Sequence, residues 1–276
     1  MAQPLAADQF LAALRAEGVR VKEYPGWRTN NRNHKGPWGP VHGVMLHHTA
    51  GTNSLRTCIE GQSAEVPGPL CIGLIDKTGL VHLIGYGRTN HAGKGSSAVL
   101  AAAKADAAPP SRPGPDEVDG NPHFYGFEIE NRGDGTDPYP APQLDASERV
   151  SAAICRAHAW TANSTIGHGE FTRRKVDPSF SMAGMRDRIA RRLRGTTTPP
   201  TSEEDTMATP ADVWAHRLAI PDGREVSAGD VLAWSDRRHD VVFKELGSVK
   251  AELAAVKTQL AALTQAVTTA LANKES

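Results

Sequence analysis

The sequence predicts a mixed α/β domain over residues 1–195, built as a central sheet flanked by helices, and a separate tail after it. Short apolar runs that alternate with helical patterns favour such a domain. The clearest run is Val44–His48, in which three apolar residues end in two histidines. A stretch rich in Thr and Pro then separates this domain from a tail with heptad spacing.

The elements of the domain follow from periodicity and from the placement of glycine and proline. Helices are predicted from apolar residues three and four positions apart, as with Phe10, Leu11 and Leu14. Asp76–Gly79 is a predicted hairpin turn between two strands. We expect helices over residues 8–17, 54–60, 99–107, 144–163 and 180–194, strands over residues 19–22, 41–48, 70–75, 80–84 and 125–130, and a polar loop over residues 109–120.

The sequence after residue 195 predicts a linker followed by a small second region. Residues 196–208 are rich in Thr, Pro and acidic residues, which is typical of a linker. Over about residues 242–272, apolar residues recur at alternating spacings of three and four: Leu246, Val249, Leu253, Val256, Leu260, Leu263, Val267 and Ala270. This pattern predicts a coiled-coil helix through which chains self-associate, and its Leu and Val placement favours three or more strands. An amphipathic helix packed on its own domain is the alternative.

Composition excludes several classes of function. The chain has 31 basic and 31 acidic residues and no strongly basic region, so we expect no nucleic-acid partner. No apolar run approaches the roughly 18–20 residues of a membrane span, and the first residues, MAQPL, do not resemble a signal peptide. We therefore expect no membrane association and a product that starts in a cytoplasm. Cys58, Cys71 and Cys155 are too few and too widely spaced for a disulfide framework or a cysteine zinc ribbon.

Three residues far apart in the sequence are candidate metal ligands. His47 ends the apolar run, His168 is flanked by glycines, and Asp177 precedes a proline that keeps it out of a helix. Zinc hydrolases usually supply three protein ligands and leave a fourth position for water. These three form a plausible set, although each alone is more often a structural residue. His48 would point to the opposite face of the strand from His47, so the two would not bind one ion.

Two glutamates are candidate general bases. Glu128 and Glu130 alternate with Phe127 and Ile129, so a regular strand would place both carboxylates on one face. A carboxylate beside a metal can take the proton of an attacking water. The spacing leaves the choice between the two glutamates open, and a solvated strand face remains the alternative for both.

These motifs together resemble the type-2 N-acetylmuramoyl-L-alanine amidases, a family that includes the peptidoglycan-recognition proteins and many phage endolysins. The resemblance is carried by Leu46–Gly51, Asn90–Gly93, Tyr125–Glu130, His168 and Lys175–Pro178, over about residues 40–195. It implies the mixed α/β amidase fold and a zinc amidase catalytic domain over residues 1–195. Some members have a tyrosine on the hairpin strand. Cys71 stands at about that position here, so more of the chemistry would rest on Glu128.

The resemblance also implies roles for particular residues. One Zn²⁺ per catalytic domain would be held by His47, His168 and Asp177. Glu128 would act as general base, and Lys175 would stabilise the negative charge of the transition state. Substrate contacts are expected from His48, Thr49, Asn90, His91 and Ala92.

The expected function is a zinc-dependent peptidoglycan hydrolase that cleaves the amide between N-acetylmuramic acid and L-alanine. The linker and tail, without a signal peptide, favour a phage endolysin held in the host cytoplasm until lysis, with residues 209–276 as a small wall-binding and oligomerising segment. A non-catalytic peptidoglycan-binding module and a virion-associated structural or entry protein are the alternatives. Glu203, Glu204 and Asp205 precede Met207, and their codons readily form a purine run that resembles a ribosome-binding site. This suggests internal initiation at Met207, which would give a separate tail product that joins full-length chains. A plain acidic linker is the other interpretation.

Overall fold

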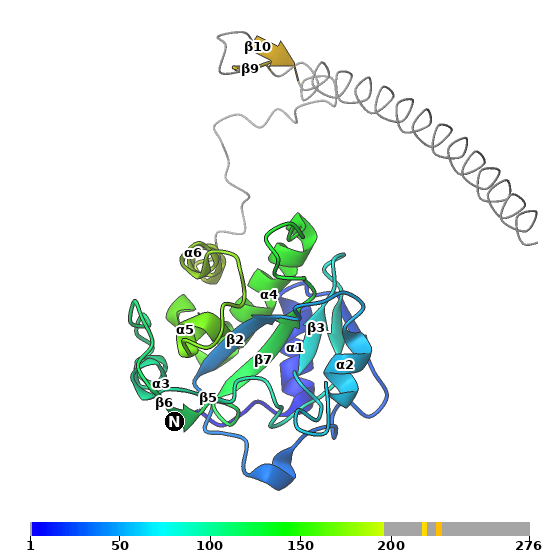
Figure 1. Cartoon of the computed structure of the whole chain (residues 1–276), viewed down its shortest axis with the longest axis vertical. Coiled ribbons are helices and arrows are strands. Elements are labelled where there is room, and N and C mark those ends of the chain that lie inside the picture. Colours follow the sequence, from blue (N-terminus) through cyan, green and yellow to red (C-terminus); the bar gives the residue numbers. More distant parts are fainter. Residues whose placement is uncertain (1, 196–216, 220–224, 228–276) are drawn as a thin grey trace, which may run out of the picture. The chain divides into compact units, whose positions relative to one another are not determined.

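The computed structural model describes residues 2–195, 217–219 and 225–227. The chain divides into two units, residues 1–199 and 200–276. The first unit is built on a six-stranded sheet of order β1-β4-β3-β7-β2-β8 (Figure 1). β3 and β4 pair antiparallel and the other four pairs are parallel, which confirms the predicted mixed sheet. The strands are β1 (Val21–Glu23), β2 (Gly43–His48), β3 (Gly73–Ile75), β4 (Val81–Leu83), β7 (Phe124–Ile129) and β8 (Thr165–Gly167).

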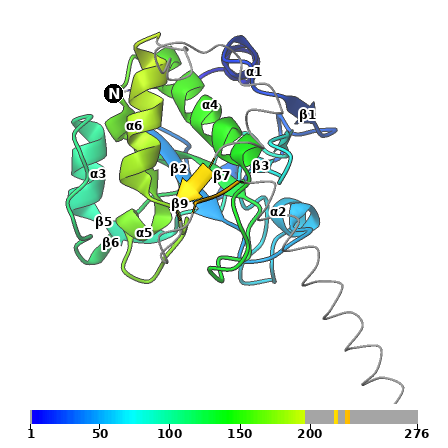
Figure 2. The ribbon, with the colours of Figure 1, turned by 90° about the horizontal axis from the view of Figure 1, so that it is seen from above.

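Helices cover both faces of the sheet, and alternation along each strand decides which side chains meet which helices. Val44 and Leu46 of β2 belong to a core cluster with α1, α4 and α6, which includes Phe10. Met45, between them, belongs to a second cluster with α3 and α5. α4 and α6 lie side by side (Figure 2). The helices are α1 (Ala7–Ala16), α2 (Leu55–Glu60), α3 (Ser97–Lys104), α4 (Ala141–His158), α5 (His168–Phe171) and α6 (Met182–Leu193), with 3₁₀ turns at Asn33–Lys35 and Ala162–Ser164.

α4 begins and ends earlier than the apolar periodicity predicts. The pattern favours residues 144–163, whereas the helix spans Ala141–His158. Pro142 fits the first turn because the N–H groups there have no partner within the helix. Ala159 ends the helix with a left-handed backbone, φ 56°. The backbone conformation of Ala159 therefore determines where α4 ends, and the spacing of apolar residues does not predict that conformation.

One predicted loop contains a strand. Within residues 109–120, β6 (Asp116–Asp119) pairs antiparallel with β5 (Lys94–Ser96) to form a separate two-stranded sheet. The sequence of β6, DEVD, lacks the apolar alternation from which strands are predicted. Gly95 allows the pair to lie against Phe171, because a Cβ there would come within 2.3 Å of the Phe171 ring.

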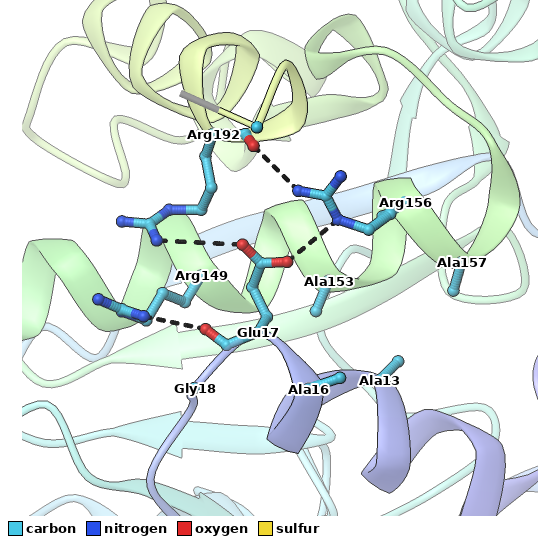
Figure 3. Close-up of a pocket in the computed structure, with 10 residues that line it drawn as sticks. Ala13, Ala16, Glu17, Gly18, Arg149, Ala153, Arg156, Ala157 and Arg192 are labelled. Atoms are coloured by element: carbon cyan, nitrogen blue, oxygen red, sulfur yellow. Dashed lines mark hydrogen bonds and ion pairs between the residues drawn. The ribbon is translucent and has the colours of Figure 1, made fainter. Parts of the chain in front are cut away.

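Charged side chains join α1, α4 and α6. Arg156 binds the Glu17 carboxylate at 3.2 Å, Arg192 lies 3.9 Å from it, and Arg149 donates to the Glu17 carbonyl oxygen at 3.0 Å (Figure 3). These residues line a cavity of about 580 Å³. Each arginine thus contacts Glu17, the residue that follows α1, so these contacts join the end of α1 to α4 and α6.

The Glu148→Ala variant should lose about 2–4 kcal/mol of unfolding free energy, because a buried carboxylate shared by two arginines is removed. Glu148 is 7% exposed and binds Arg188 at 2.8 Å and Arg192 at 2.7 Å. Urea unfolding measures the loss. The exposed Glu60, which pairs with Arg56 one helical turn away, is the control, and Glu60→Ala should change stability by about 0.5 kcal/mol or less. Equal losses in the two variants would contradict the argument.

The second unit is described only in part. β9 (Arg217–Ala219) and β10 (Glu225–Ser227) form an antiparallel pair with Val226 opposite Leu218. The predicted linker at 196–208, the heptad helix at about 242–272 and Met207 lie outside the described residues, so self-association and internal initiation stay predictions. Within the part of the chain that is described, no helix is long and apolar enough to span a membrane.

Candidate metal centre

The sheet register places His47 beside Glu128. β2 and β7 run parallel with His47 opposite Glu128, two residues beyond the Met45–Gly126 pair. His47 therefore projects from the same face as Met45, toward α3 and α5, and it is 1% exposed. His48 projects the other way, and its Nδ1 lies 3.0 Å from the Tyr139 hydroxyl. The two neighbouring histidines are thus separated by the sheet, as the alternation predicts.

His168 and Asp177 reach the same face from the segment after β8. His168 begins α5 directly after the strand, and both it and Asp177 are buried. The backbone N–H of Gly169 donates to the Asp177 carbonyl oxygen at 2.7 Å. This hydrogen bond brings the segment after α5 back to the start of that helix. The Asp177 carboxylate therefore lies beside the His168 imidazole, although it is nine residues later in the chain.

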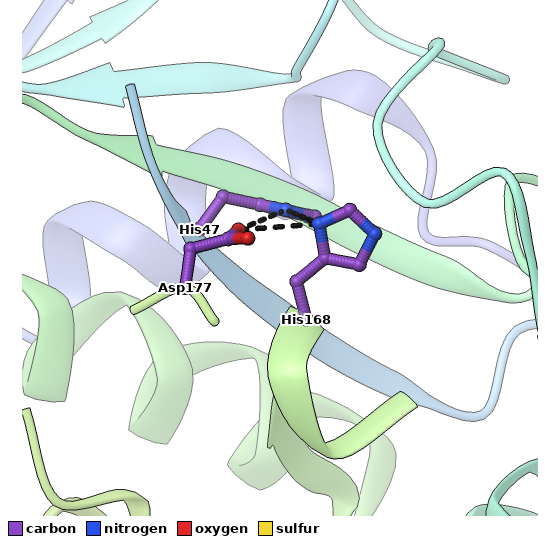
Figure 4. A group of neighbouring side chains, drawn as sticks. All are labelled: His47, His168 and Asp177. Carbon is purple, nitrogen blue, oxygen red and sulfur yellow. Dashed lines mark hydrogen bonds and ion pairs between the residues drawn. The ribbon is translucent and has the colours of Figure 1, made fainter. Parts of the chain in front are cut away.

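Three donor atoms converge at this point (Figure 4). His47 Nδ1 lies 3.0 Å from His168 Nδ1 and 3.2 Å from Asp177 Oδ2, and His168 Nδ1 lies 3.1 Å from the same oxygen. Tetrahedral zinc with ligands at about 2.0–2.1 Å separates neighbouring ligand atoms by about 3.3–3.4 Å. The observed triangle is close to that size, so the geometry of the three donors fits a zinc ion.

The nitrogen of His168 that faces away from the three converging donors also indicates a cation site. His168 Nε2 lies 3.1 Å from the Ala92 carbonyl oxygen, which only accepts hydrogen bonds. In its neutral form His168 therefore carries its hydrogen on Nε2, and its Nδ1 lone pair faces Asp177 and His47. A carboxylate and imidazole lone pairs converging in a buried site repel one another unless a proton or a cation lies between them.

The ionisation states also suit a cation. Burial lowers the pKa of His47 to about 4, and the nearby His168 ring adds to the effect, so this ring is neutral at pH 7. Burial opposes ionisation of Asp177, but hydrogen bonds from the His168 and His47 rings, which need a hydrogen on the facing ring nitrogen, outweigh it and hold the pKa of this carboxyl well below its usual range. A cation between the same three atoms favours the ionised carboxylate in the same way. A neutral imidazole and an ionised carboxylate are the forms that bind metals.

Glu128 and Glu130 have different surroundings. Burial and the nearby Asp177 carboxylate raise the pKa of Glu128 to about 8, against the opposing effect of Lys175. The Glu128 Oε2 atom is enclosed and has no hydrogen-bond partner among the described residues. Glu130 lies beyond the end of β7, and its Oε1 accepts from the Ser54 backbone N–H at 3.3 Å. Of the two carboxylates, Glu128 is the one that shares the site with the metal donors.

Comparisons with known proteins agree with this arrangement. Residues 37–180, just over half of the chain, match the family model described as N-acetylmuramoyl-L-alanine amidase. This chain belongs to that family. The three candidate metal donors and Glu128 all lie within the matched residues. No curated protein matches the chain.

Solved structures resemble this amidase at low identity. The endolysin and N-acetylmuramoyl-L-alanine amidase LysCS from Clostridium intestinale URNW is 15% identical with a TM-score of 0.43, over 62% of this chain and 95% of that one. The Ph2119 endolysin from Thermus scotoductus MAT2119 bacteriophage Ph2119 is 17% identical with a TM-score of 0.39, over 62% and 99%. AmpD from Citrobacter freundii is 17% identical with a TM-score of 0.36, over 67% and 95%.

The residues predicted to contact the amidase substrate fall into two groups. Asn90, His91 and Ala92 line a cavity of about 450 Å³ together with His168 and Lys175. His48 and Thr49 are not among the lining residues. The Thr49 hydroxyl donates to the Gly51 carbonyl oxygen at 2.8 Å, while His48 contacts Tyr139.

Two residues that contact the predicted site residues carry no clear signal in the sequence. Asn121 is 8% exposed, and its side-chain oxygen accepts from the backbone of residues 91–93. Tyr139 links His48 to Ser179, with its hydroxyl 3.0 Å from each partner atom. Both stand in turn-rich segments with no periodic pattern. The Asn121-Pro122 and Asp137-Pro138 pairs mark turns but do not indicate which residues Asn121 and Tyr139 contact.

The raised pKa of Glu128 predicts a pH-dependent stability of the metal-free amidase. Between about pH 4.5 and pH 8 the folded protein holds a proton on Glu128 that the unfolded chain releases, so the free energy of unfolding falls as pH rises. Compared with Glu128→Gln, the wild type should lose about 4–5 kcal/mol across this window. Urea unfolding with a chelator present measures the difference. A difference that stays constant with pH would contradict the prediction.

Proposed function

We propose that this chain is a zinc-dependent peptidoglycan amidase that cleaves the bond between the lactyl group of N-acetylmuramic acid and the L-alanine of the stem peptide. The observation that carries the proposal is the convergence of His47 Nδ1, His168 Nδ1 and Asp177 Oδ2 within 3.2 Å of one another, inside the residues that match the amidase family. Two nitrogens and one carboxylate oxygen form a typical catalytic zinc set.

The chemistry needs an activated water, a polarised carbonyl and a protonated leaving amine. Zinc bound to these donors would act as a Lewis acid and lower the pKa of a water to about 7. Glu128 lies beside His47 in the sheet, and the positive charge of bound zinc would favour its ionised form, in which it takes the proton of the attacking water and passes it to the leaving nitrogen. Lys175, two residues before Asp177, opposes the negative charge that develops on the carbonyl oxygen.

The substrate enters through the cavity beside His168. Residues 90–93, Arg174 and Lys175 are among the residues that line it. We assign the stem peptide to this groove, with Asn90 and Ala92 as contacts. His48 and Thr49 do not line this cavity, so they would contact a part of the substrate that lies outside it.

We further propose that the amidase is a phage endolysin, kept in the host cytoplasm and released to the cell wall at lysis. The support is the predicted modular order of the sequence, in which a catalytic domain is joined by a Thr/Pro-rich linker to a small tail. Finding the chain in purified virus particles would instead favour a role in entry.

The test uses purified peptidoglycan and the full chain. Turbidity should fall, and new amino termini should appear at L-alanine without new reducing ends. Treatment with a chelator should stop both, and Zn²⁺ should restore them. New reducing ends instead of amino termini, or full activity after complete removal of zinc, would overturn the proposal.

A further inference from the structure

We infer that the segment 91–93, in which His91 and Ala92 are buried and which is held by the side chain of Asn121, orients both histidine donors of the proposed metal centre, and that Asn121 is a positioning residue for zinc binding. The inference rests on the proposed zinc site and adds to it a residue outside the ligand set. It also gives His91 a role toward His47 rather than toward the substrate alone.

Adjacent residues contact the outer nitrogen of each imidazole. His47 Nε2 lies 3.0 Å from His91 Nδ1, and the two rings are nearly perpendicular at 84°. His168 Nε2 lies 3.1 Å from the carbonyl oxygen of the next residue, Ala92. When His47 binds metal through Nδ1, its hydrogen is on Nε2 and His91 Nδ1 accepts it. Such outer hydrogen bonds fix the tautomer and the ring orientation of a metal-binding histidine.

Packing leaves His91 little freedom. The residue is 7% exposed, and its ring lies over Gly126 of β7, where a Cβ would come within 2.4 Å of His91 Cγ. Gly126 pairs with Met45, two residues before His47 in β2. Because Gly126 has no side chain, the His91 imidazole can occupy the space above β7 at this position.

Asn121 holds the segment from the other side. Its Oδ1 accepts from three consecutive backbone N–H groups, those of His91 at 3.0 Å, Ala92 at 2.9 Å and Gly93 at 3.4 Å. The Gly120 N–H donates to the Gly93 carbonyl oxygen at 2.7 Å. One oxygen atom thus fixes the backbone that presents both His91 Nδ1 and the Ala92 carbonyl group.

Contacts of Asp119 fix the position of Asn121. Its backbone N–H donates to Asp119 Oδ1 at 2.9 Å, and Asp119 Oδ2 pairs with Arg88. Three residues further on, the chain enters β7, the strand that carries Glu128. The same segment therefore links the orientation of the metal donors to the strand of the proposed base.

The Asn121→Leu variant should bind Zn²⁺ about 10–100-fold more weakly than the wild type, the usual effect of losing an outer-shell contact. Asn121→Asp keeps an oxygen acceptor and should restore most of the affinity. Competition with a chromogenic chelator measures both. Ser96→Ala is the matched control, because Ser96 is 0% exposed and its Oγ accepts from the backbone N–H groups of Val99 and Gly114 without touching residues 91–93. This control should lose stability but bind zinc normally.

A second pair of variants tests the support directly and does not depend on Asn121→Leu folding. Asn places an oxygen near the position of the His91 Nδ1 atom, so His91→Asn should keep zinc affinity within about threefold. His91→Leu should lose about 10–100-fold. The visible spectrum of the Co²⁺-loaded chain should shift in His91→Leu and Asn121→Leu, but not in Ser96→Ala, because only the first two alter the orientation of the ligands.

The outcomes separate this inference from the proposed function. Wild-type protein that binds zinc and cleaves peptidoglycan, together with unchanged affinity and cobalt spectra in Asn121→Leu and His91→Leu, would overturn the inference alone. Equal losses in His91→Asn and His91→Leu would also overturn it, because the acceptor atom would then be irrelevant. Wild-type protein that binds no zinc would overturn both.

Discussion

His168→Ala should abolish zinc-dependent amide hydrolysis, with a loss of at least about a thousandfold in rate. The change removes one of three donors that lie 3.0–3.2 Å apart and leaves a buried carboxylate beside a single imidazole. The Lewis acid that polarises the carbonyl contributes several kcal/mol, and each 1.36 kcal/mol is about tenfold in rate. Zinc content by atomic absorption and release of amino termini from peptidoglycan measure the two effects.

His82→Ala is the matched control for this variant. His82 also pairs with a carboxylate, since its Nε2 lies 2.9 Å from Asp76 Oδ2, but the pair is on β4 and the hairpin turn. Added zinc should raise the melting temperature of the wild type and of His82→Ala, because a ligand that binds only the folded state stabilises it. It should not do so for His168→Ala. A zinc-induced rise of equal size in His168→Ala would exclude His168 as a ligand.

Glu128→Gln should lower kcat by about 10²–10⁴-fold, the usual contribution of a general base. The side chain keeps its size but can no longer take a proton. Its effect on zinc affinity should be small, because Glu128 is not one of the three converging donors. Kinetics on a soluble muramoyl-peptide, with the zinc content of each sample measured, separate catalysis from metal loss.

Glu130→Gln decides between the two glutamates that the strand pattern left open. Gln keeps an oxygen that can accept from the Ser54 N–H, so folding should be preserved and kcat should change by less than about threefold. The opposite ranking of the two variants would assign the base to Glu130. Equal and small effects would mean that neither carboxylate acts as the base.

Much of the fold was predictable because its signals are local. The apolar run that ends at His48 and the alternation through Ile129 predicted β2 and β7, and the Asp76–Gly79 turn predicted the β3–β4 hairpin. The prediction failed at β6, which was expected to be a loop. β6 is short and acidic, so its pairing with β5 depends on a distant partner and not on its own pattern.

The sequence by itself determined which residues were chemically suited to the site. His47 at a strand end, His168 between glycines and Asp177 before a proline were recognisable because residue type and neighbours along the chain carry that information. The tertiary structure alone decided which of them meet. His47 and Glu128 become neighbours through the parallel register of β2 and β7, and Asn121 accepts hydrogen bonds from backbone N–H groups about 30 residues earlier. Such contacts form only when distant segments pack together, and no periodicity within either segment specifies them.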